Sequence, residues 1–482
     1  MEQKITRVSV GIEGYDEISY GGLLKGRVYL VCGNPGSGKT IFGLHFLTTG
    51  VNAGESVLFI SMAEHEAQVK ENAEILGFDT SGFNFLDLTP ESDFFLEMKT
   101  YDIFSPAEVE RQPTTDLIIQ KVNQVKPARV FIDAMTQFRY LATDEFQFRK
   151  QVLSFLRFLR DQGATIVLTS EGTTQVPDDD LKFMCDGIIQ MNYGDTGRTV
   201  TIVKSRGSDF KGGHHIMRIT GEGIKIFPML VPEAHHAEFV PSQISSGIPQ
   251  LDEMLAGGIE RGTISMITGP AGVGKTTLGL QFMKEAASIG IHSIIYTFEE
   301  DVATLVTRSE GIGIPLNQMI VDGLISVVNV EPLLYFPDEF ANLVRKQVEE
   351  ESVKVVMLDG TSGYRMSMQG GDLTRHLHAL GKYLVNMGVT FILICETEYI
   401  TGEFRATEMG ISYLSDNLIF MRHYEFNGEV RRCIGVLKKR LTDHGKTLRE
   451  FEITSEGLKV GQPLLGVQGI LSGVPTILHE NQ

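Results

Sequence analysis

Two glycine-rich segments carry a lysine and a hydroxyl residue at a fixed spacing, and these residue types together suit phosphate binding. Gly33–Thr40 and Gly269–Thr276 both fit the pattern G-x-x-x-x-G-K-[ST]. In such a loop the glycines let backbone N–H groups surround a polyphosphate, the lysine reaches the β- and γ-phosphates, and the hydroxyl coordinates Mg²⁺. Each loop should open a helix whose positive N-terminal end attracts phosphate. The residues expected to bind nucleotide here are Gly36, Ser37, Gly38, Lys39, Thr40, Ile41, Gly272, Val273, Gly274, Lys275, Thr276 and Thr277.

Carboxylates follow apolar runs in both halves of the chain, as phosphoryl transfer requires. Asp133 and Asp359 each end such a run, and a buried strand would place them beside the phosphate loop. With Thr40 and Thr276 they are the predicted Mg²⁺ ligands. The alternative is that each Asp is a solvent-facing acid after a core strand.

A second set of carboxylates differs between the halves. Glu299 and Glu300 follow the run Ile294–Thr297, and we expect both to be catalytic, with Glu299 also close to the metal. At the corresponding positions the first half has Ala63 and Glu64. Glu64 is the candidate catalytic carboxylate there, and slower turnover is expected in the first half. The alternative is that Glu64 suffices and Ala63 changes little.

A Lys-x-Arg triplet occurs late in each half. Lys204-Ser205-Arg206 and Lys438-Lys439-Arg440 occupy the same place in the repeat. In a ring, the outer residues of each triplet could reach the nucleotide of a neighbouring subunit, where arginine fingers contribute roughly 10³–10⁵ in rate. The central residues, Ser205 and Lys439, are candidate nucleotide contacts. The alternative is that these are ordinary cations at a sheet edge.

These residues belong to a duplicated framework. Gly11 and Gly247, like Lys39 and Lys275, are separated by 236 residues, which predicts two homologous domains. We expect a first domain over residues 1–232, a second over 244–464, and a short C-terminal tail over 465–482. The chain of 482 residues is long enough for about two to three domains of ~100–200 residues each.

Apolar runs alternate with helical patterns in both halves, which indicates an α/β fold with a mostly parallel sheet flanked by helices. Each half then closes with a β-rich stretch, Thr199–Phe227 and Val430–Val460. The expected strands are Val28–Cys32, Val57–Ser61, Val130–Ile132, Thr165–Thr169, Ile264–Thr268, Ile294–Thr297, Val355–Leu358 and Thr390–Cys395.

Composition narrows the classes of partner. The chain is 42% hydrophobic and 22% charged, with no apolar run near the ~18 residues of a membrane span and no apolar signal core at its start. Its four cysteines are far apart, which is typical of reduced thiols in a cytoplasmic protein. The net charge of −18 argues against a broad basic footprint for nucleic acid.

Taken together, these motifs resemble the KaiC family, the double-domain RecA-like ATPases of the cyanobacterial clock. The segment Ser245–Met254 adds to the resemblance, which runs from about Val8 to Thr476. It implies two tandem RecA-like domains, a two-tiered hexamer with nucleotides at subunit interfaces, slow ATP hydrolysis in the first tier and autophosphorylation in the second. It also implies that Thr220 and Arg432 lie near the base or sugar of the neighbouring site.

The phosphorylated segment of the family matches only partly. Adjacent Ser and Thr precede Ile-Thr-Asp in the family, whereas this chain reads Gly410-Ile-Ser-Tyr-Leu-Ser-Asp416. Ser412 falls on the Ser position and Tyr413 replaces the Thr. The resemblance therefore makes Ser412 or Tyr413 the candidate phosphoacceptor, and the alternative is that Ser412 is an ordinary helix or turn serine.

Partners follow from the same resemblance. Clock members of the family carry a longer tail that KaiA binds, and only Ile477–Gln482 follow Thr476 here, so a KaiA-type partner is not expected. A KaiB-type partner on the first domain is left open. A homo-oligomer is expected.

Three functions are compatible with these residues. The first is a ring-forming ATPase with serine/threonine autokinase activity in the second domain, acting in signalling or timing. The second is a DNA-handling motor, which predicts a basic channel loop. The cations between Asp133 and Thr165 do not form such a cluster: Arg139, Arg149, Lys150, Arg157 and Arg160. The third is a nucleotide-gated scaffold with little catalysis, which Ala63 favours for the first domain.

Overall fold

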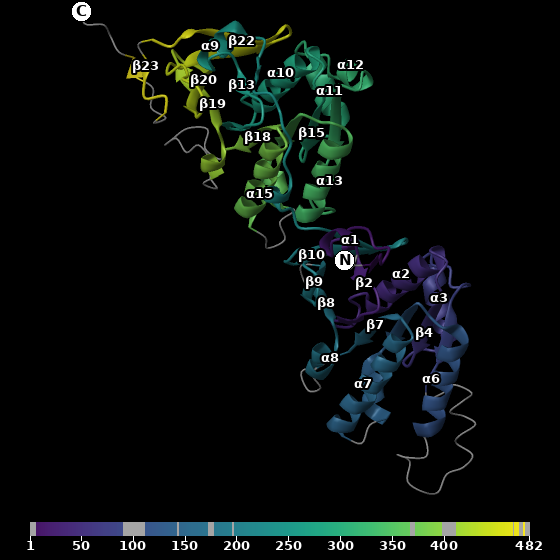
Figure 1. Ribbon diagram of the computed structural model, residues 1–482. Helices are drawn as coiled ribbons and strands as arrows, with labels where there is room; N and C mark the ends of the chain where they lie inside the picture. The colour runs from purple at the N-terminus through teal and green to yellow at the C-terminus, as the bar shows by residue number, and fades with distance from the viewer. Residues whose placement is uncertain are drawn as a thin grey trace, which may run out of the picture. The chain divides into compact units, whose positions relative to one another are not determined.

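The computed structural model describes residues 6–89, 111–141, 144–171, 178–194, 197–366, 372–397, 411–465, 467–471 and 476–477. The chain divides into two compact units, Met1–Met229 and Leu230–Gln482 (Figure 1). Each unit contains one phosphate loop, and each is a three-layer α/β structure built on a nine-stranded sheet.

The first unit places its phosphate-loop strand, β3, in the middle of the sheet order β11-β10-β9-β8-β3-β7-β6-β4-β5. Its elements are β1 (Arg7–Val8), α1 (Tyr15–Ile18), β2 (Leu23–Leu24), β3 (Val28–Cys32), α2 (Lys39–Asn52), β4 (Val57–Ser61), α3 (Glu66–Ile75), β5 (Asn84–Asp87), α6 (Arg111–Val125), β6 (Arg129–Asp133), η1 (Met135–Leu141), α7 (Glu145–Asp161), β7 (Thr165–Ser170), α8 (Asp179–Met184), β8 (Gly187–Gly194), β9 (Gly197–Ser205), β10 (His215–Thr220) and β11 (Gly223–Phe227).

The second unit repeats this order around β14, as β16-β15-β17-β18-β14-β19-β20-β21-β22. Its elements are η2 (Pro232–Ala234), β12 (Gln243–Ile244), α9 (Pro249–Met254), β13 (Ile259–Glu260), β14 (Ile264–Gly269), α10 (Lys275–Ser288), β15 (Ser293–Thr297), α11 (Val302–Glu310), α12 (Leu316–Val321), β16 (Ile325–Asn329), α13 (Pro337–Glu350), β17 (Val355–Asp359), α14 (Thr361–Met366), α15 (Leu373–Asn386), β18 (Thr390–Glu396), η3 (Ile411–Leu414), β19 (Asn417–Phe426), β20 (Glu429–Lys439), β21 (Arg449–Thr454), β22 (Gly457–Pro463), β23 (Val467–Gln468) and β24 (Thr476–Ile477).

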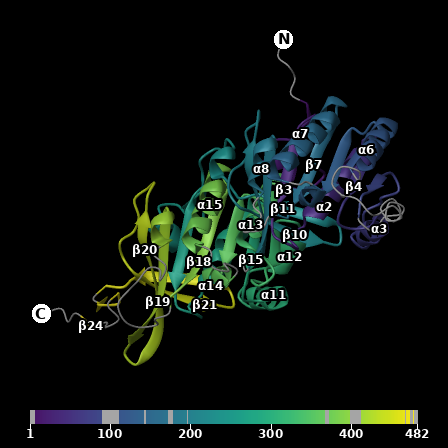
Figure 2. The same cartoon turned by 90° about the horizontal axis from the view of Figure 1, so that it is seen from below.

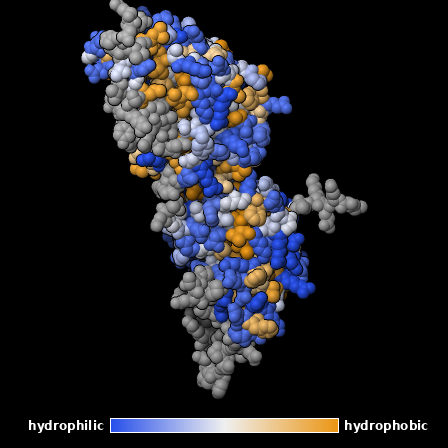
Figure 3. Space-filling model, turned by 90° about the vertical axis from the view of Figure 1, so that its left-hand side faces the viewer, coloured by the Kyte–Doolittle hydropathy of each residue, from blue (hydrophilic) through white to orange (hydrophobic). Residues whose placement is uncertain are grey.

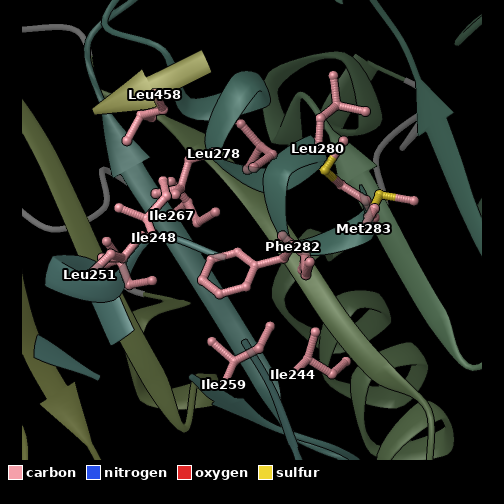
Figure 4. Close-up of a cluster of buried hydrophobic side chains, with 14 of the residues drawn as sticks. Ile244, Ile248, Leu251, Ile259, Ile267, Leu278, Leu280, Phe282, Met283 and Leu458 are labelled. Carbon is pink, nitrogen blue, oxygen red and sulfur yellow. The ribbon is translucent and has the colours of Figure 1, made fainter. Parts of the chain in front are cut away.

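Alternation along the strands explains why helices cover both faces of each sheet. In β14, Met266 and Ile267 are both fully buried but belong to different hydrophobic clusters. Ile267 packs in the cluster that contains Leu278 and Phe282 of α10 (Figure 4), and Met266 packs in the cluster that contains helices α13 and α15. Successive side chains of a strand point to opposite faces, so an uninterrupted apolar strand needs cover on both. The predicted α/β class with a mostly parallel sheet is confirmed.

The register of the central strands fixes what lies at each end of the sheet. β14 is parallel to β18 and to β19, so the phosphate loop leaves at the carboxyl ends of all three. β19 and β20 lie side by side (Figure 2) and form a long antiparallel pair, in which Leu418 is opposite Lys438. The end of β20 therefore returns to the amino-terminal end of β14. In the first unit, β3, β8 and β9 repeat this arrangement, with Ile188 opposite Lys204.

The surface carries both hydrophilic and hydrophobic side chains, as the mixed composition of the chain leads us to expect. On the face drawn in Figure 3, hydrophilic side chains surround separate hydrophobic patches. Within the described ranges, none of the helices combines the length and the hydrophobicity needed to cross a membrane.

The close packing of the loop helices on the sheet gives a matched test of the repeated core. Gly43 in α2 faces Phe131, and a methyl group added there would overlap the buried ring; at the matching position, a methyl on Gly279 would meet the Met357 sulfur. Overpacking costs about 1–3 kcal/mol, and Met adapts more easily than a ring. We expect Gly43→Ala to speed amide exchange in β6 more than Gly279→Ala does in β17, as measured by hydrogen-exchange mass spectrometry of the full chain. Equal or slower exchange in Gly43→Ala would contradict the packing described.

Candidate nucleotide and phosphoryl-transfer sites

The two phosphate loops have the backbone conformation that their glycines permit. Gly36 and Gly38 have φ of 76° and 101°, and Gly272 and Gly274 have φ of 73° and 112°. Gly38 and Gly274 are the N-caps of α2 and α10, and neither helix has a side-chain cap. The first N–H groups of each helix are therefore directed at the loop, where an anion would satisfy them.

The loop lysines are anchored by their own loops. Lys39 Nζ donates to the Gly33 carbonyl oxygen at 3.0 Å, and Lys275 Nζ donates to the Pro270 carbonyl oxygen at 2.9 Å. Lys275 Nζ also lies 3.6 Å from Glu396 Oε1. Burial lowers the pKa of Lys275, and the charge of Glu396 opposes that effect. Both ammonium groups are held at the position from which a phosphate could be contacted.

In each unit, the threonine of the phosphate loop donates a hydrogen bond to the aspartate that is predicted to bind Mg²⁺ with it. Thr40 Oγ1 donates to Asp133 Oδ2 at 2.6 Å, and Thr276 Oγ1 donates to Asp359 Oδ1 at 3.0 Å. Asp133 also accepts from Thr169 Oγ1. Burial raises the pKa of Asp359 to about 6, and the bond from Thr276 opposes that effect. Hydroxyl and carboxylate oxygens are the ligands that Mg²⁺ prefers, and paired with phosphate oxygens they fit this ion.

The second unit has a cavity of about 350 Å³ at its loop. It extends from the start of α10 to the carboxyl ends of β15, β17 and β18, where an open parallel sheet characteristically binds its ligand. The residues that line it are Gly272, Gly274, Lys275, Thr276, Thr277, Thr297, Glu299, Glu300, Arg308, Ile312, Asp359, Gly360, Ile394, Glu396 and Ile453. The loop and both predicted groups of carboxylates are therefore brought together here.

Glu299 and Glu300 lie differently in this cavity. A Cβ on Gly360 would be 3.1 Å from Glu299 Oε1, so the Glu299 carboxylate lies against the backbone that follows Asp359. Burial and the negative charge of Glu396 raise the pKa of Glu299, while Lys275 opposes this effect. Glu300 instead forms an ion pair with Arg308 at 2.7 Å. Glu299 is thus the member of the pair that faces the metal and phosphate region.

In the first unit, Glu64 matches Glu300 in position. Ser61 Oγ donates to the Glu64 carbonyl, as Thr297 Oγ1 donates to the Glu300 carbonyl, so the two turns are alike. The Glu64 side chain is exposed and accepts from Asn72 Nδ2 at 3.5 Å. Ala63 occupies the place of Glu299, so this turn offers no carboxylate there.

The lysines of the two Lys-x-Arg triplets bind backbone carbonyls of their own chain. Lys204 Nζ donates to Lys182 O at 2.9 Å and Cys185 O at 2.7 Å, at the end of α8. Lys438 Nζ donates to Ser412 O at 3.1 Å and Ser415 O at 2.6 Å, at the end of η3. An ammonium has three N–H donors, so each keeps one for another acceptor.

The other triplet residues differ in exposure. Arg206 is exposed, and Arg440 is half exposed while donating to Asp416 Oδ1 at 3.3 Å and the Tyr413 carbonyl at 2.9 Å. Ser205 lies opposite Gly187 at the end of β9. Lys439 is fully buried in an ion pair with Glu260 at 2.6 Å, so a nucleotide contact by its Nζ would require that pair to open.

The phosphoacceptor candidates lie in η3, beside the second triplet. Ser412 is half-buried, and the Tyr413 side chain is exposed. Because Lys204 and Lys438 bind equivalent carbonyls, Lys182 is the first-unit counterpart of Ser412. A hydroxyl therefore occurs at this position only in the second of the two described segments.

Thr220 and Arg432 lie toward the phosphate-loop end of their own sheets. Thr220 ends β10 next to Ile219, whose Cδ1 would be 3.1 Å from a Cβ on Gly38. Arg432 lies opposite His423, two residues beyond Met421, whose carbonyl packs on Gly269. In the first unit, Arg198 matches Arg432 and donates from Nε to the Gly36 carbonyl at 3.0 Å.

The sequence motifs do not predict three residues that lie at these sites: Arg198, Arg308 and Glu396. Arg308 is eight residues from Glu300 on an exposed helix and carries no motif. The repeat does give a signal for Glu396. Glu171 follows Ile166 by five residues, and Glu396 follows Phe391 by the same number. Ile166 and Phe391 are equivalent, because each pairs with the strand that leads to its phosphate loop.

Comparison with known proteins supports one family for both units. The family model described as "ATPase: KaiC" matches residues 8–231 and 244–464. The chain is 28% identical to the circadian clock protein KaiC3 of Synechocystis sp., over 99% of this chain and 96% of that protein. It is 26% identical to the circadian clock oscillator protein KaiC of Acaryochloris marina (98% and 92% covered) and 27% identical to that of Parathermosynechococcus lividus (99% and 90% covered).

Proposed function

The chain belongs to the KaiC family of ATPases, and from this premise we propose that it is a ring-forming ATPase whose second RecA-like domain is a serine autokinase. The acceptor that we propose is Ser412, and the donor is ATP bound with Mg²⁺ at the second phosphate loop of a neighbouring subunit. A hexamer is the ring that the KaiC resemblance implies. A role in signalling or timing accords with the names of the relatives.

One observation carries the proposal. Ser412, Lys438 and Arg440 lie together at the amino-terminal end of the central strands, while the phosphate loop and Glu299 lie at the carboxyl end. β14 spans roughly 17 Å between these ends at ~3.3 Å per residue. A hydroxyl at one end is out of reach of its own loop, but a neighbouring copy could present its loop there.

The chemistry assigned to these residues is a phosphoryl transfer. Ser412 Oγ attacks the γ-phosphorus, a new O–P bond forms, the bond to the β–γ bridging oxygen breaks, and ADP leaves. Glu299 of the subunit that holds the ATP accepts the hydroxyl proton. Arg440 and the remaining N–H of Lys438 stabilise negative charge on the transferred group. When bound, Mg²⁺ would neutralise charge on the β- and γ-oxygens from a site at Thr276 and Asp359.

For the first domain we propose slower ATP hydrolysis. It has the loop, the Thr40–Asp133 pair and the Lys204–Arg206 triplet, but Ala63 leaves the turn without a counterpart of Glu299, and Glu64 matches Glu300 instead. Ala63 also gives specific support to a second candidate, in which this domain is a nucleotide-gated scaffold. Tight ADP retention without hydrolysis would favour that candidate.

The DNA-motor alternative gains no support from α7. Arg149 pairs with Asp180 at 3.4 Å, Arg157 pairs with Asp161 at 3.9 Å, and Arg139 lies over the Phe148 ring. Among the described cations of this stretch, Arg149 and Arg157 are thus paired with carboxylates and Arg139 packs on a ring, so these three do not indicate a cluster of free cations.

The autokinase proposal predicts phosphate on Ser412 that depends on Glu299. We expect wild-type chain incubated with Mg-ATP to gain one phosphate in the peptide that contains Ser412, and Glu299→Gln to reduce this by 10²-fold or more, on the order of a general base contribution. Peptide mass spectrometry measures both. Ser412→Ala should remove the modified peptide. Incorporation that is unchanged in Glu299→Gln would remove Glu299 from the role.

A carboxylate introduced into the first domain should raise its hydrolysis rate. In a chain whose second loop is disabled by Lys275→Ala, we expect Ala63→Glu to increase ADP release on the order of 10-fold or more. Ala63→Gln is the matched control, since it adds a side chain of similar size without the charge. An equal gain in both variants, or no gain in either, would show that the missing carboxylate does not limit this domain.

A further inference from the structure

The second carboxylate of the Glu-Glu turn is held by an arginine fork. Arg308 Nε donates to Glu300 Oε1 at 3.1 Å, and Arg308 Nη2 donates to Glu300 Oε2 at 2.7 Å. A two-bond pair of this kind fixes direction as well as distance. Glu300 is anchored from its backbone too, because Thr297 Oγ1 donates to its carbonyl at 2.9 Å and accepts from its N–H at 3.2 Å. Neither oxygen of Glu300 can turn toward the loop without losing a charge-assisted bond.

The first domain provides a natural comparison. Asn72 stands 236 residues before Arg308, on the equivalent helix α3, and gives Glu64 a single bond of 3.5 Å. The turns themselves match, as the bonds from Ser61 and Thr297 show. The domain with Glu299 therefore has the arginine, and the domain with Ala63 has only the weak amide contact.

The cavity of the second domain has more acidic than basic side chains, so Arg308 can neutralise a carboxylate there, which the uncharged Asn72 cannot do in the first domain. Among the described lining residues, the acids are Glu299, Glu300, Asp359 and Glu396, and the cations are Lys275 and Arg308. Lys275 lies at the loop beside Glu396. Arg308 is thus the cation that pairs with Glu300, which would otherwise add its negative charge to those of Glu299, Asp359 and Glu396.

We propose that Arg308 is a positioning residue that divides the work of the two glutamates, holding Glu300 aside so that Glu299 alone is directed at the reacting oxygen. The inference rests on the proposed function of the second domain. Arg308 acts through Glu300, and without the fork Glu300 competes with Glu299 for Lys275 and for the space in front of Gly360. The contrasting role is a direct contact between Arg308 and the nucleotide.

A double-mutant cycle separates these two roles. In a chain whose first loop is disabled by Lys39→Ala, kcat and KM for ADP release and the rate of phosphate incorporation are measured for Arg308→Asn, Glu300→Ala and the double variant. Misplacement of a catalytic group by about 1 Å can cost on the order of 10²-fold. We expect Arg308→Asn to lower kcat by about 10- to 100-fold with little change in KM, and to cost less than about 2-fold when Glu300 is already Ala.

Two control variants test whether the effect of Arg308→Asn comes from loss of the fork rather than from loss of a surface charge. Arg308→Lys keeps the charge but cannot form the fork, and we expect it to recover little of the lost kcat. Lys346→Asn removes an exposed ion pair with Glu350 on α13 and should match wild type in kcat and KM. The proposal is overturned if Arg308→Asn costs the same factor with and without Glu300, if it mainly raises KM, or if Arg308→Lys restores kcat in full.

The positioning role of Arg308 and the autokinase proposal can fail independently, and the measurements distinguish the two failures. If wild-type chain incorporates no phosphate at Ser412 but Arg308→Asn still slows ADP release in the coupled pattern above, the autokinase proposal fails and the positioning role stands. If phosphate appears at Ser412 and is unaffected by Arg308→Asn, the positioning role fails and the autokinase stands.

Discussion

The parallel register around the central strand of each sheet is the constraint on which the rest of the molecule depends. Because β14 runs parallel to β18 and β19, the phosphate loop, Asp359, the Glu299 turn and Glu396 emerge at one end of the sheet. The antiparallel return of β20 carries Lys438 and Arg440 to the other end, beside Ser412. The fit of individual side chains in the two clusters holds this register, since a slip by one residue would move Met266 into the cluster of Ile267 and Ile267 into the opposite cluster.

The duplication lets one domain serve as the reference for the other. The frame, the phosphate loops, the threonine–aspartate pairs and the lysine contacts at the far end are repeated. Three differences concern the proposed phosphoryl transfer: Ala63, Asn72 and Lys182 stand in the first domain where Glu299, Arg308 and Ser412 stand in the second. All three departures remove from the first domain a group that phosphoryl transfer to a serine would use. The family provides the ATPase framework, and we propose that these positions give the two halves different chemistry.

Much of the fold could be predicted because its signals are local. The apolar strands that lead to Gly33 and Gly269, and the aspartates that end β6 and β17, can be read from a few consecutive residues. What escaped prediction depends on distant partners. Lys439 is predicted as a nucleotide contact from its place in the triplet, but no local signal reveals its ion pair with Glu260, which lies 179 residues earlier. The surroundings of Glu299 and Glu300 differ because Arg308 of α11 pairs with Glu300, and no sequence motif marks this arginine. No spacing rule predicts such contacts, because tertiary packing alone decides them.

If one copy of the chain phosphorylates another, two inactive variants should complement each other when they are co-expressed. Lys275→Ala lacks a functional second loop but keeps Ser412, whereas Ser412→Ala keeps the loop but lacks the acceptor. We expect neither variant alone to carry phosphate at residue 412, and after co-expression we expect the Lys275→Ala chain, identified by intact mass, to carry it on Ser412. If the wild-type chain is phosphorylated but the co-expressed pair is not, Ser412 receives its phosphate from the loop of its own chain, and transfer between copies is ruled out.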